Sequence, residues 1–403
     1  MVKPTKTAES SKPAKPRPDF PLFPHNTGRW CKKVKGRFVY FGKVADDPHG
    51  NKAIELWLEQ RDELLAGRTP RTKPGGLTLR ELLDRYMVSK RCLVDTCELS
   101  PRTFAELYST CKRIGDIFGI NRLVDDLASD DFERLRKVFA KTWGPVRLGN
   151  EIQRVRSVFK FGYEAGLIDK PVRFGPTFKK PSRKVLRLNR AKKGPKMFDA
   201  DELRKIIDAA GVPLKAMILL GINCGFGNSD VSNLLIKAVD MKAGWIDFAR
   251  PKTGIARRCP LWPETVAAIK DALEKRPKPK DKTDNGLMFI TKYGGRWFRF
   301  TIGEPDEENG GDRKMYQDDP VTKEFTKIIK ELKIHRPGLG FYSLRHTFET
   351  VAGDSKDQVA VDHIMGHAKE DMATLYREKI EDARLVAVTD HVHKWLFENE
   401  ETT

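Results

Sequence analysis

The chain has 403 residues, too many for one ordinary hydrophobic core, so two or three domains are expected. Lysine and arginine number 75 against 56 aspartate and glutamate, and the formal charge of +19 favours a polyanionic partner, either nucleic acid or an anionic membrane surface. No apolar run approaches the ~20 residues of a membrane span, and the N-terminal residues lack the hydrophobic segment of a secretory signal, so we expect neither an integral membrane protein nor a secreted one, and nucleic acid is the favoured partner.

The cysteines show no pattern of a metal site or a disulfide framework. None of the six forms a C-x-x-C pair, and no paired histidines stand near one. Scattered single cysteines are typical of reduced thiols, and we therefore expect a cytoplasmic protein with no bound metal. The six are Cys31, Cys92, Cys97, Cys111, Cys224 and Cys259.

The N-terminal region divides into a tail and a small module. Residues 1–20 are rich in lysine, proline and serine, which predicts a disordered basic tail. Residues 21–72 show strand patterns on both sides of a Lys35-Gly36 turn and then apolar residues at helical spacing, which predicts a β-hairpin followed by a helix. Lysines on such a ribbon suit a DNA groove and equally suit solubility. The expected DNA contacts are Lys32, Lys33 and Lys35.

Residues 76–175 carry four helical patterns, which predict a four-helix domain. The first begins at Thr78, where Glu81 completes a capping box, and the second at Ser100, which precedes a proline at the first helical position. The fourth predicted helix carries several basic residues on its surface. A basic helix face is either solvated or follows a phosphate backbone, and the net charge favours the second interpretation. The expected DNA contacts are Arg147, Arg154, Arg156 and Lys160.

A strongly basic segment precedes the last domain. Residues 179–196 hold nine lysines or arginines and no acid, which predicts an interdomain linker over 176–196 that either crosses a DNA backbone, through Arg183 and Lys184, or is a flexible spacer. Residues 197–403 then show several helices and one strand-turn-strand pattern. The predicted fold is multidomain and mainly α: a small N-terminal β-hairpin and helix module, a four-helix domain, and an α-rich domain with a small antiparallel sheet.

The C-terminal stretch FYSLRHTFETVAGDSKDQVAVDHIMGHAKEDMATLYREK spaces Arg345, His367 and Tyr376 in a chemically suggestive way. Arginine forks onto a phosphate through two N–H groups, and histidine donates to a phosphate oxygen or carries a proton. A tyrosine becomes a nucleophile when nearby cations stabilise its phenolate. These three residue types together suit attack on a phosphodiester, with the charge stabilised by fixed cations and without a metal.

These motifs resemble the tyrosine recombinase (phage integrase) family. The usual form there is H-x-L-R-H, then L-G-H, then a nucleophilic tyrosine nine residues past that histidine; here S-L-R-H-T-F, M-G-H and Tyr376 match, with Tyr342 in place of the first histidine. The hairpin RPKTGIARRCPL resembles the one that carries the family's catalytic lysine, which places that role on Lys252. The resemblance covers most of the chain from about residue 21, and it is specific only in the C-terminal part.

The resemblance implies a role for each matched residue. Tyr376 would attack the scissile phosphate and form a 3′-phosphotyrosyl link, while Arg345 holds the non-bridging oxygens. Lys252 would protonate the leaving 5′-hydroxyl, His367 would assist at the phosphate or in proton transfer, and Tyr342 can donate a hydrogen bond.

The family also implies the protein's partners. Because the covalent link conserves the bond energy, neither ATP nor another cofactor is expected. The expected partners are double-stranded DNA, three further copies in a homotetramer on synapsed DNA, and accessory DNA-bending proteins. The protein would then be associated with the nucleoid when bound to DNA.

One position departs strongly from the family pattern. The family's first arginine lies in a motif like T-G-L-R-x-x-E, and the corresponding stretch NCGFGNSDVSNL places Gly227 where that arginine belongs. Losing a phosphate-clamping arginine removes several kcal/mol of transition-state stabilisation unless another cation replaces it. The candidate replacements on or beside the hairpin are Arg250, Arg257 and Arg258.

Three functions remain open from the sequence. The first is a site-specific recombinase, most simply the integrase of a mobile element, and the intact nucleophile favours it. The second is a DNA-binding protein that has kept the fold and lost catalysis, which Gly227 favours. The third is a relaxing enzyme like a type IB topoisomerase, against which the N-terminal module argues. The target site, the direction of recombination and the accessory proteins are not encoded in any motif.

Overall fold

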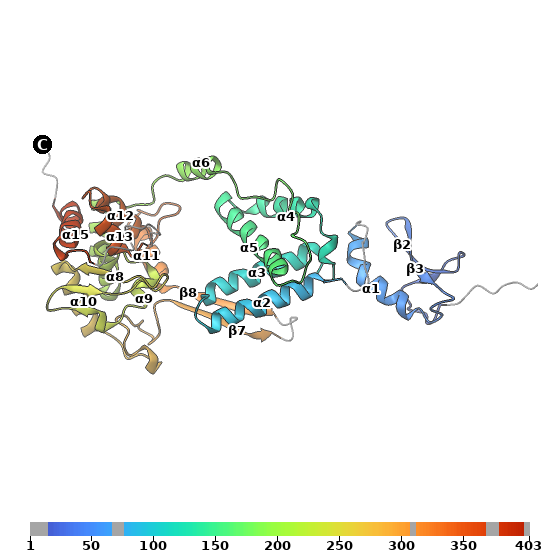
Figure 1. The fold of residues 1–403 in the computed structure, drawn as a ribbon. Coiled ribbons are helices and arrows are strands. Elements are labelled where there is room, and N and C mark those ends of the chain that lie inside the picture. The colour runs from blue at the N-terminus through green and yellow to red at the C-terminus, as the bar shows by residue number, and fades with distance from the viewer. Residues whose placement is uncertain (1–14, 67–75, 307–311, 368–378, 399–403) are drawn as a thin grey trace, which may run out of the picture. The chain divides into compact units, whose positions relative to one another are not determined.

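The computed structural model describes residues 15–66, 76–306, 312–367 and 379–398. The chain divides into two compact units, residues 1–188 and 189–403, which are described separately. The elements are mainly helices with small antiparallel sheets, as predicted (Figure 1). Most of the expected basic tail, residues 1–14, lies outside the described residues, whereas Phe20 is buried against Trp30.

The N-terminal module is a three-stranded antiparallel sheet followed by one helix. Strands β1 (Phe23–Pro24), β2 (Arg29–Val34) and β3 (Arg37–Lys43) pair in that order, and α1 spans Asn51–Leu65. The hairpin turn has positive φ at both central residues, 46° at Lys35 and 83° at Gly36, which matches the twist of the flanking strands. Trp30, Phe41 and Trp57 fill the core between the sheet and α1.

The helical domain of the first unit contains the four predicted helices: α2 (Leu79–Asp95), α3 (Pro101–Phe118), α4 (Ser129–Thr142) and α5 (Pro145–Glu164). A short 3-10 turn, η1 (Val124–Asp126), precedes α4. The capping box of Thr78 and Glu81 is present. The apolar stripes of all four helices meet in one core, because each helix repeats its apolar residues every three to four positions.

A helix, α6 (Arg183–Lys193), lies where the sequence pattern predicts only a linker. The boundary between the two units falls within it. None of its residues is buried, so its helical form rests on the high helix propensity of alanine, leucine, lysine and arginine rather than on packing. The Ser182 hydroxyl accepts the Val185 N–H at its start.

The second unit is built around the apolar helix α8 (Val212–Asn223), which is buried on nearly all sides. Five of the longer helices pack against it (Figure 1): α7 (Ala200–Ala209), α10 (Pro263–Glu274), α11 (Pro320–Glu331), α12 (Ser343–Gly353) and α15 (Asp382–Phe397). The shorter helices are α9 (Asn228–Ser232), η2 (Ile236–Ala238), η3 (Lys282–Asp284) and α13 (Gln358–Met365).

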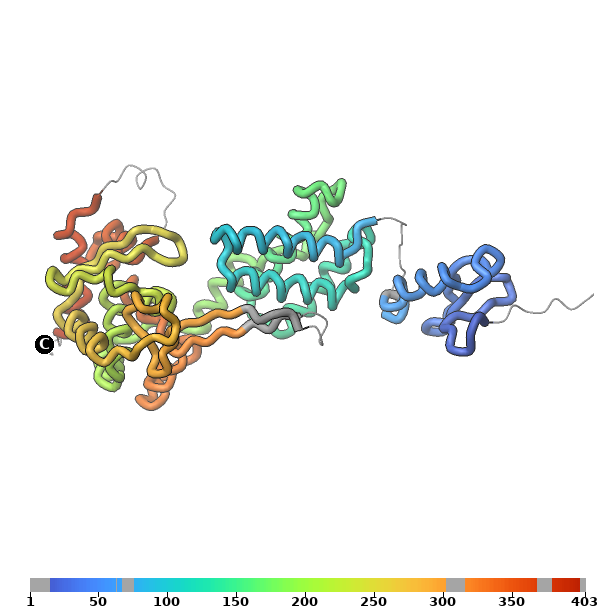
Figure 2. The backbone as a smooth tube through the Cα atoms, turned by 90° about the horizontal axis from the view of Figure 1, so that it is seen from below, coloured from blue at the N-terminus to red at the C-terminus, as the bar shows by residue number. Residues whose placement is uncertain are grey.

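Two small antiparallel sheets complete this unit. Strands β4 (Val239–Asp240), β5 (Trp245–Asp247) and β6 (Arg258–Pro260) form the predicted sheet. Backbone bonds between Phe248 and Arg257 and between Arg250 and Ile255 continue the β5–β6 hairpin toward its turn. A second hairpin, β7 (Arg299–Asp306) with β8 (Asp312–Asp318), was not anticipated from the sequence, and it runs out from the body of the unit (Figure 2).

Among the described residues, no helix has both the length and the apolar character needed to cross a membrane.

Candidate active site

Arg345 projects from the first turn of α12 into the interior of the second unit. Its residue is only 3% exposed, its Nη1 donates to the carbonyl oxygen of Gly225 at 2.7 Å, and its Nη2 donates to that of Met365 at 2.8 Å. Burial lowers the pKa of Arg345 to about 10, and the positive charge of Arg250 acts in the same direction. A guanidinium that is destabilised in this way gains from any anion that binds beside it.

Arg257 is buried next to the same loops. Its Nη2 donates to Asp230 Oδ1 at 3.0 Å, its Nε donates to the Phe248 carbonyl oxygen at 2.9 Å, and its guanidinium lies 4.3 Å from the centre of the Phe226 ring. Its Nη1 is buried and has no hydrogen-bond partner among the described residues. Burial lowers the pKa of Arg257, and the charge of Asp230 offsets part of this effect.

Gly366, the glycine of the M-G-H motif, brings these arginines together. It ends α13 in the left-handed region, with φ of 63°, and a Cβ atom there would lie 2.7 Å from Arg257 Cδ and 3.2 Å from Arg250 Cβ. Arg250 Nη1 also donates to the Gly366 carbonyl oxygen at 3.2 Å. Both the backbone conformation and the close approach therefore require glycine at this position.

The three arginines form a cluster with excess positive charge. The charged groups that act on Arg345 are Arg250 and Arg257 on the one side and Asp230 and the Tyr342 phenol on the other. Among the described residues, Arg257 is the one of these three arginines that is bonded to a carboxylate, that of Asp230. We call Arg250, Arg257 and Arg345 the arginine cluster; its charge and its N–H donors suit a phosphate group.

Gly227, the position without the expected arginine, lies beside this cluster and under the Tyr342 ring. A Cβ atom on Gly227 would lie 3.1 Å from two Tyr342 ring atoms and 3.4 Å from Asp230 Oδ2. The Gly227 N–H donates to that same carboxylate oxygen at 2.7 Å. The two positions that depart from the family pattern, Gly227 and Tyr342, are therefore neighbours in space. The acid of the motif, Asp230, accepts a hydrogen bond from the guanidinium of Arg257.

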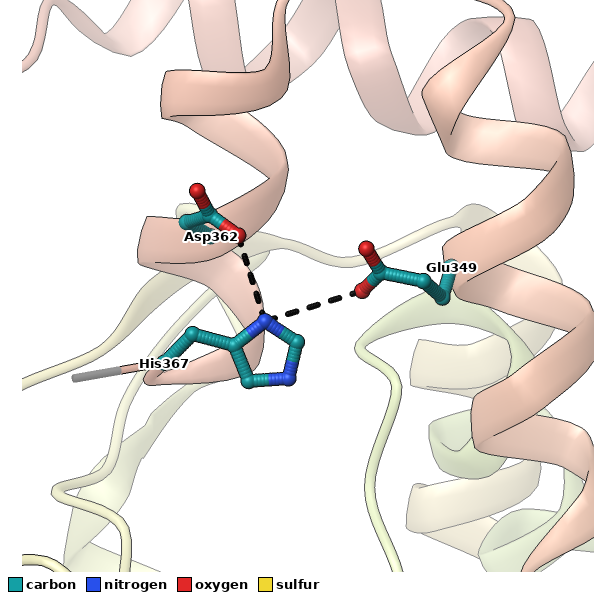
Figure 3. A group of neighbouring side chains, drawn as sticks. All are labelled: Glu349, Asp362 and His367. Carbon is teal, nitrogen blue, oxygen red and sulfur yellow. Dashed lines mark hydrogen bonds and ion pairs between the residues drawn. The ribbon is translucent and has the colours of Figure 1, made fainter. Parts of the chain in front are cut away.

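His367 follows Gly366 and is partly exposed, with its Nδ1 3.2 Å from Asp362 Oδ1 and 3.7 Å from Glu349 Oε2 (Figure 3). Neither carboxylate was singled out from the sequence. A signal was available for one of them, since Glu349 follows Arg345 by four residues and therefore shares its side of α12.

The remaining predicted site residues of the second unit lie apart from these contacts. Lys252 is exposed in the hairpin turn, where the Arg250 carbonyl accepts the N–H groups of the two residues after Lys252. Arg258 is bonded to Asp247 at 2.6 Å and to Asp382 at 2.9 and 3.2 Å. These bonds raise the pKa of Arg258, and the bond to Asp382 has the largest effect. The structure does not join Arg258 to the arginine cluster, because successive strand residues point to opposite faces. Tyr376 lies outside the described residues.

The lysines of the N-terminal module differ in their contacts. Lys32 donates to the Pro21 carbonyl oxygen at 2.9 Å and lies 5.3 Å from the Trp57 ring centre, so it covers the helix side of the sheet. Lys33 lies 5.8 Å from the ring centre of the exposed Phe38, on the other face. Lys35 is exposed in the turn. Lys33 and Lys35 are therefore the lysines of this set that a groove could meet directly.

The predicted basic contacts on α5 and α6 are also placed. Arg154 is bonded to Glu106 and Glu151 and so contributes to a partly buried ion network. The others remain candidates for phosphate contact. Arg147 lies over Trp143 at 4.4 Å, Arg156 lies over Phe174 at 4.4 Å and donates to the Phe178 carbonyl oxygen at 3.1 Å, Lys160 pairs with Glu164 at 3.3 Å, and Arg183 and Lys184 are exposed at the start of α6.

Solved structures of DNA integrases share this fold. A lambda integrase dimer bound to a COC′ core site matches with a TM-score of 0.52 and 16% identity, over 91% of this chain and 99% of that one. A lambda integrase tetramer bound to a Holliday junction gives the same values. The Tn1549 transposon integrase in complex with a circular intermediate DNA matches with a TM-score of 0.54 and 16% identity, over 78% and 99% of the two chains. The chain therefore has the multidomain integrase fold.

The C-terminal domain identifies the family. Residues 196–382 match the model of the phage integrase family. A search of curated proteins gave no match. The sequence motifs, the family match and the shared fold agree, and the C-terminal domain over residues 196–382 is a phage integrase family domain.

Proposed function

We propose that the protein is a site-specific DNA recombinase that cleaves and rejoins DNA through a 3′-phosphotyrosyl intermediate on Tyr376. The observation that carries the proposal is the arginine cluster, in which Arg257 is bonded to Asp230 while Arg250 and Arg345 donate only to backbone carbonyl oxygens among the described residues. A site with excess positive charge and donors fixed on one side is suited to the charge that develops on a phosphodiester during attack.

Arg257 replaces the phosphate-binding arginine that is missing at position 227. It is anchored to Asp230, the acid that the family motif places three residues after its arginine, and its buried Nη1 has no described partner. Arg345 supplies the second guanidinium, and Arg250 adds charge beside Gly366. The compensation favours an active enzyme over a DNA-binding relic.

The reaction follows from these groups. The Tyr376 oxygen forms a bond to phosphorus while the bond to the 5′ oxygen breaks, and the arginine cluster stabilises the extra negative charge on the non-bridging oxygens. The 5′ oxygen takes a proton from Lys252, whose exposed position on a hairpin turn leaves it able to approach DNA. His367 accepts the proton that the Tyr376 hydroxyl loses as it attacks, and the exposed Tyr342 donates a further hydrogen bond through its hydroxyl.

The other regions would hold the DNA. We assign residues 1–20 as a basic tail whose last residue, Phe20, packs in the module that follows, 21–72 as an arm-type DNA module, 76–175 as the core-binding domain, 176–196 as the linker that contains α6, and 197–403 as the catalytic domain. A homotetramer on synapsed DNA is the working assembly, as in the lambda integrase tetramer on a Holliday junction, and accessory DNA-bending proteins would assist it. The high positive charge supports DNA as the partner.

A nicked suicide duplex tests the proposal. The duplex is taken from DNA flanking the gene, and the protein is incubated with it and examined for a covalent protein–DNA band. We expect a band with the wild-type protein and none with Tyr376→Phe, which keeps the ring and removes the nucleophile. Specific binding with no band on a validated site would instead support the DNA-binding protein that has lost catalysis, and relaxation of supercoiled DNA without a specific site would support a topoisomerase.

A further inference from the structure

Two carboxylates lie beside the same nitrogen of the His367 imidazole, Nδ1 (Figure 3). Its Nδ1 lies 3.2 Å from Asp362 Oδ1 and 3.7 Å from Glu349 Oε2, and Nε2 is on the side of the ring away from Asp362. Gln358 donates from its one amide nitrogen to Glu349 Oε1 at 3.1 Å and to Asp362 Oδ1 at 3.2 Å. The amide therefore donates to both carboxylates and offsets part of the repulsion between them.

The two carboxylates lie on helices next to the arginine cluster: Glu349 is on α12, which also carries Arg345, and Asp362 is on α13, which ends at Gly366. Glu349 lies four residues after Arg345 on α12, so one helix presents a guanidinium and a carboxylate on the same side. Asp362 lies on α13, whose last turn leads to Gly366 and His367; its backbone carbonyl also accepts the His367 N–H at 2.9 Å. The Glu349 Oε2 atom is buried, and the His367 Nδ1 is its described ionic partner.

We propose that Glu349 and Asp362 are positioning residues that hold the proton of His367 on Nδ1 and leave Nε2 as the atom that exchanges a proton with the reacting groups. The proposal rests on the recombinase function and goes beyond it, since the family resemblance gives a role to His367 alone. Two negative charges behind the ring stabilise the positive charge that develops on it when Nε2 accepts a proton.

The neighbouring residues explain why this chain needs such support. Tyr342 stands where the family pattern has its first histidine, so the imidazole of that position is missing here. Burial lowers the pKa of His346, the positive charges of Lys196 and Arg190 lower it further, and the charge of Glu349 only partly offsets them, so protonation of that imidazole is disfavoured. His367, by contrast, has two carboxylates beside one ring nitrogen.

The proposal is tested with the full chain and the nicked duplex in single turnovers at saturating DNA. Glu349→Gln keeps the shape and removes the charge, and we expect the rate of covalent complex formation to fall about tenfold or more, with unchanged DNA half-saturation. His367→Gln should lower the rate further. The double variant should be no slower than His367→Gln alone, because the carboxylate acts only through the ring. Asp354→Asn, which removes an exposed carboxylate at the end of the same helix, should leave the rate unchanged.

An NMR measurement separates this proposal from the proposed function, because it needs no activity. The ¹⁵N shifts of His367 should show the Nδ1-protonated tautomer in the wild-type protein and its loss in Glu349→Gln combined with Asp362→Leu. If the wild type forms no covalent complex but shows this tautomer, the recombinase function fails and the positioning stands.

Three results would overturn the positioning role outright, and a fourth would replace it by a metal site. They are an Nε2-protonated wild-type ring, additive losses in the double variant, or a Glu349→Gln effect confined to unfolding temperature. The three ligand atoms also lie within 4.8 Å of one another, a spacing that a divalent cation can span. Slower cleavage after EDTA treatment, restored by Zn²⁺ or Mn²⁺, would likewise replace the positioning role by a metal site.

Discussion

Replacing Arg257 by methionine separates the structural from the catalytic role of the relocated arginine. The side chain is almost fully buried, and the substitution removes its bonds to Asp230 and to the Phe248 carbonyl. Methionine has a similar length, so the loss is mainly of charge and hydrogen bonds rather than of volume.

The expected loss of stability is large. Breaking a buried ion pair by removing one partner costs about 3–5 kcal/mol, because the remaining charge stays buried. Asp230 retains one hydrogen bond, from the Gly227 N–H, which places the loss toward the lower end. Adding Asp230→Asn removes the orphaned charge, and this double variant should recover most of the unfolding free energy in urea denaturation.

Cleavage should not recover with stability. If Arg257 stabilises the charge on the phosphate, both variants should form the covalent complex roughly 10²–10³-fold more slowly than the wild type in single turnovers on the nicked duplex. Arg258→Met is the matched control: it removes the next arginine along, which pairs with Asp247 and Asp382 and lies outside the cluster. Recovery of both stability and cleavage in the double variant would refute the reasoning, and so would an equal loss of cleavage in Arg258→Met.

Three further predictions concern packing, DNA contact and pH. Gly227→Arg should lower the unfolding free energy by about 1 kcal/mol because the new side chain meets the Tyr342 ring, and adding Tyr342→Ala should restore it; equal unfolding curves for the single variant and the wild type would contradict this contact. In salt titrations of duplex binding, Lys33→Ala should reduce the slope of log K against log salt by about 0.9, whereas Lys32→Ala should change it little because Lys32 is held by the Pro21 carbonyl; equal slopes would remove the distinction. Burial raises the pKa of Asp131, but bonds from two arginines and a backbone N–H outweigh it and leave the pKa below its ordinary value of 3.8. The ionised Asp131 therefore contributes its full stabilisation above pH 3.8, and this contribution is lost as the pH falls through the lower pKa of the folded state. Below pH 3.8, amide exchange in α4 should become faster in the wild type, and it should depend less on pH in Asp131→Asn.

Local patterns in the sequence were sufficient for most helices and for the family. The capping box of Thr78 and Glu81, the Ser100-Pro101 start and the apolar repeats each depend on residues within one or two turns, so they can be interpreted without a partner element. The motif residues Arg345 and His367 were likewise visible, since their spacing is carried by two consecutive helices. Such short-range features are determined by the chain itself.

The tertiary structure decided which charges meet. Arg257 and Asp230 lie 27 positions apart, and only the folding of the β5–β6 hairpin against the start of α9 shows that Arg257 meets the acid beside Gly227 while Arg258 points elsewhere. Glu349 and His367 lie on neighbouring helices whose packing no local pattern specifies. The hairpin of β7 and β8 was missed because strand pairing depends on a distant partner, and helix α6 because its residues bury nothing. The sequence alone determined most of the helices and the types of reactive residue. Long-range packing determined which arginine pairs with Asp230 beside Gly227, because charged groups pair with the groups that lie near them in space.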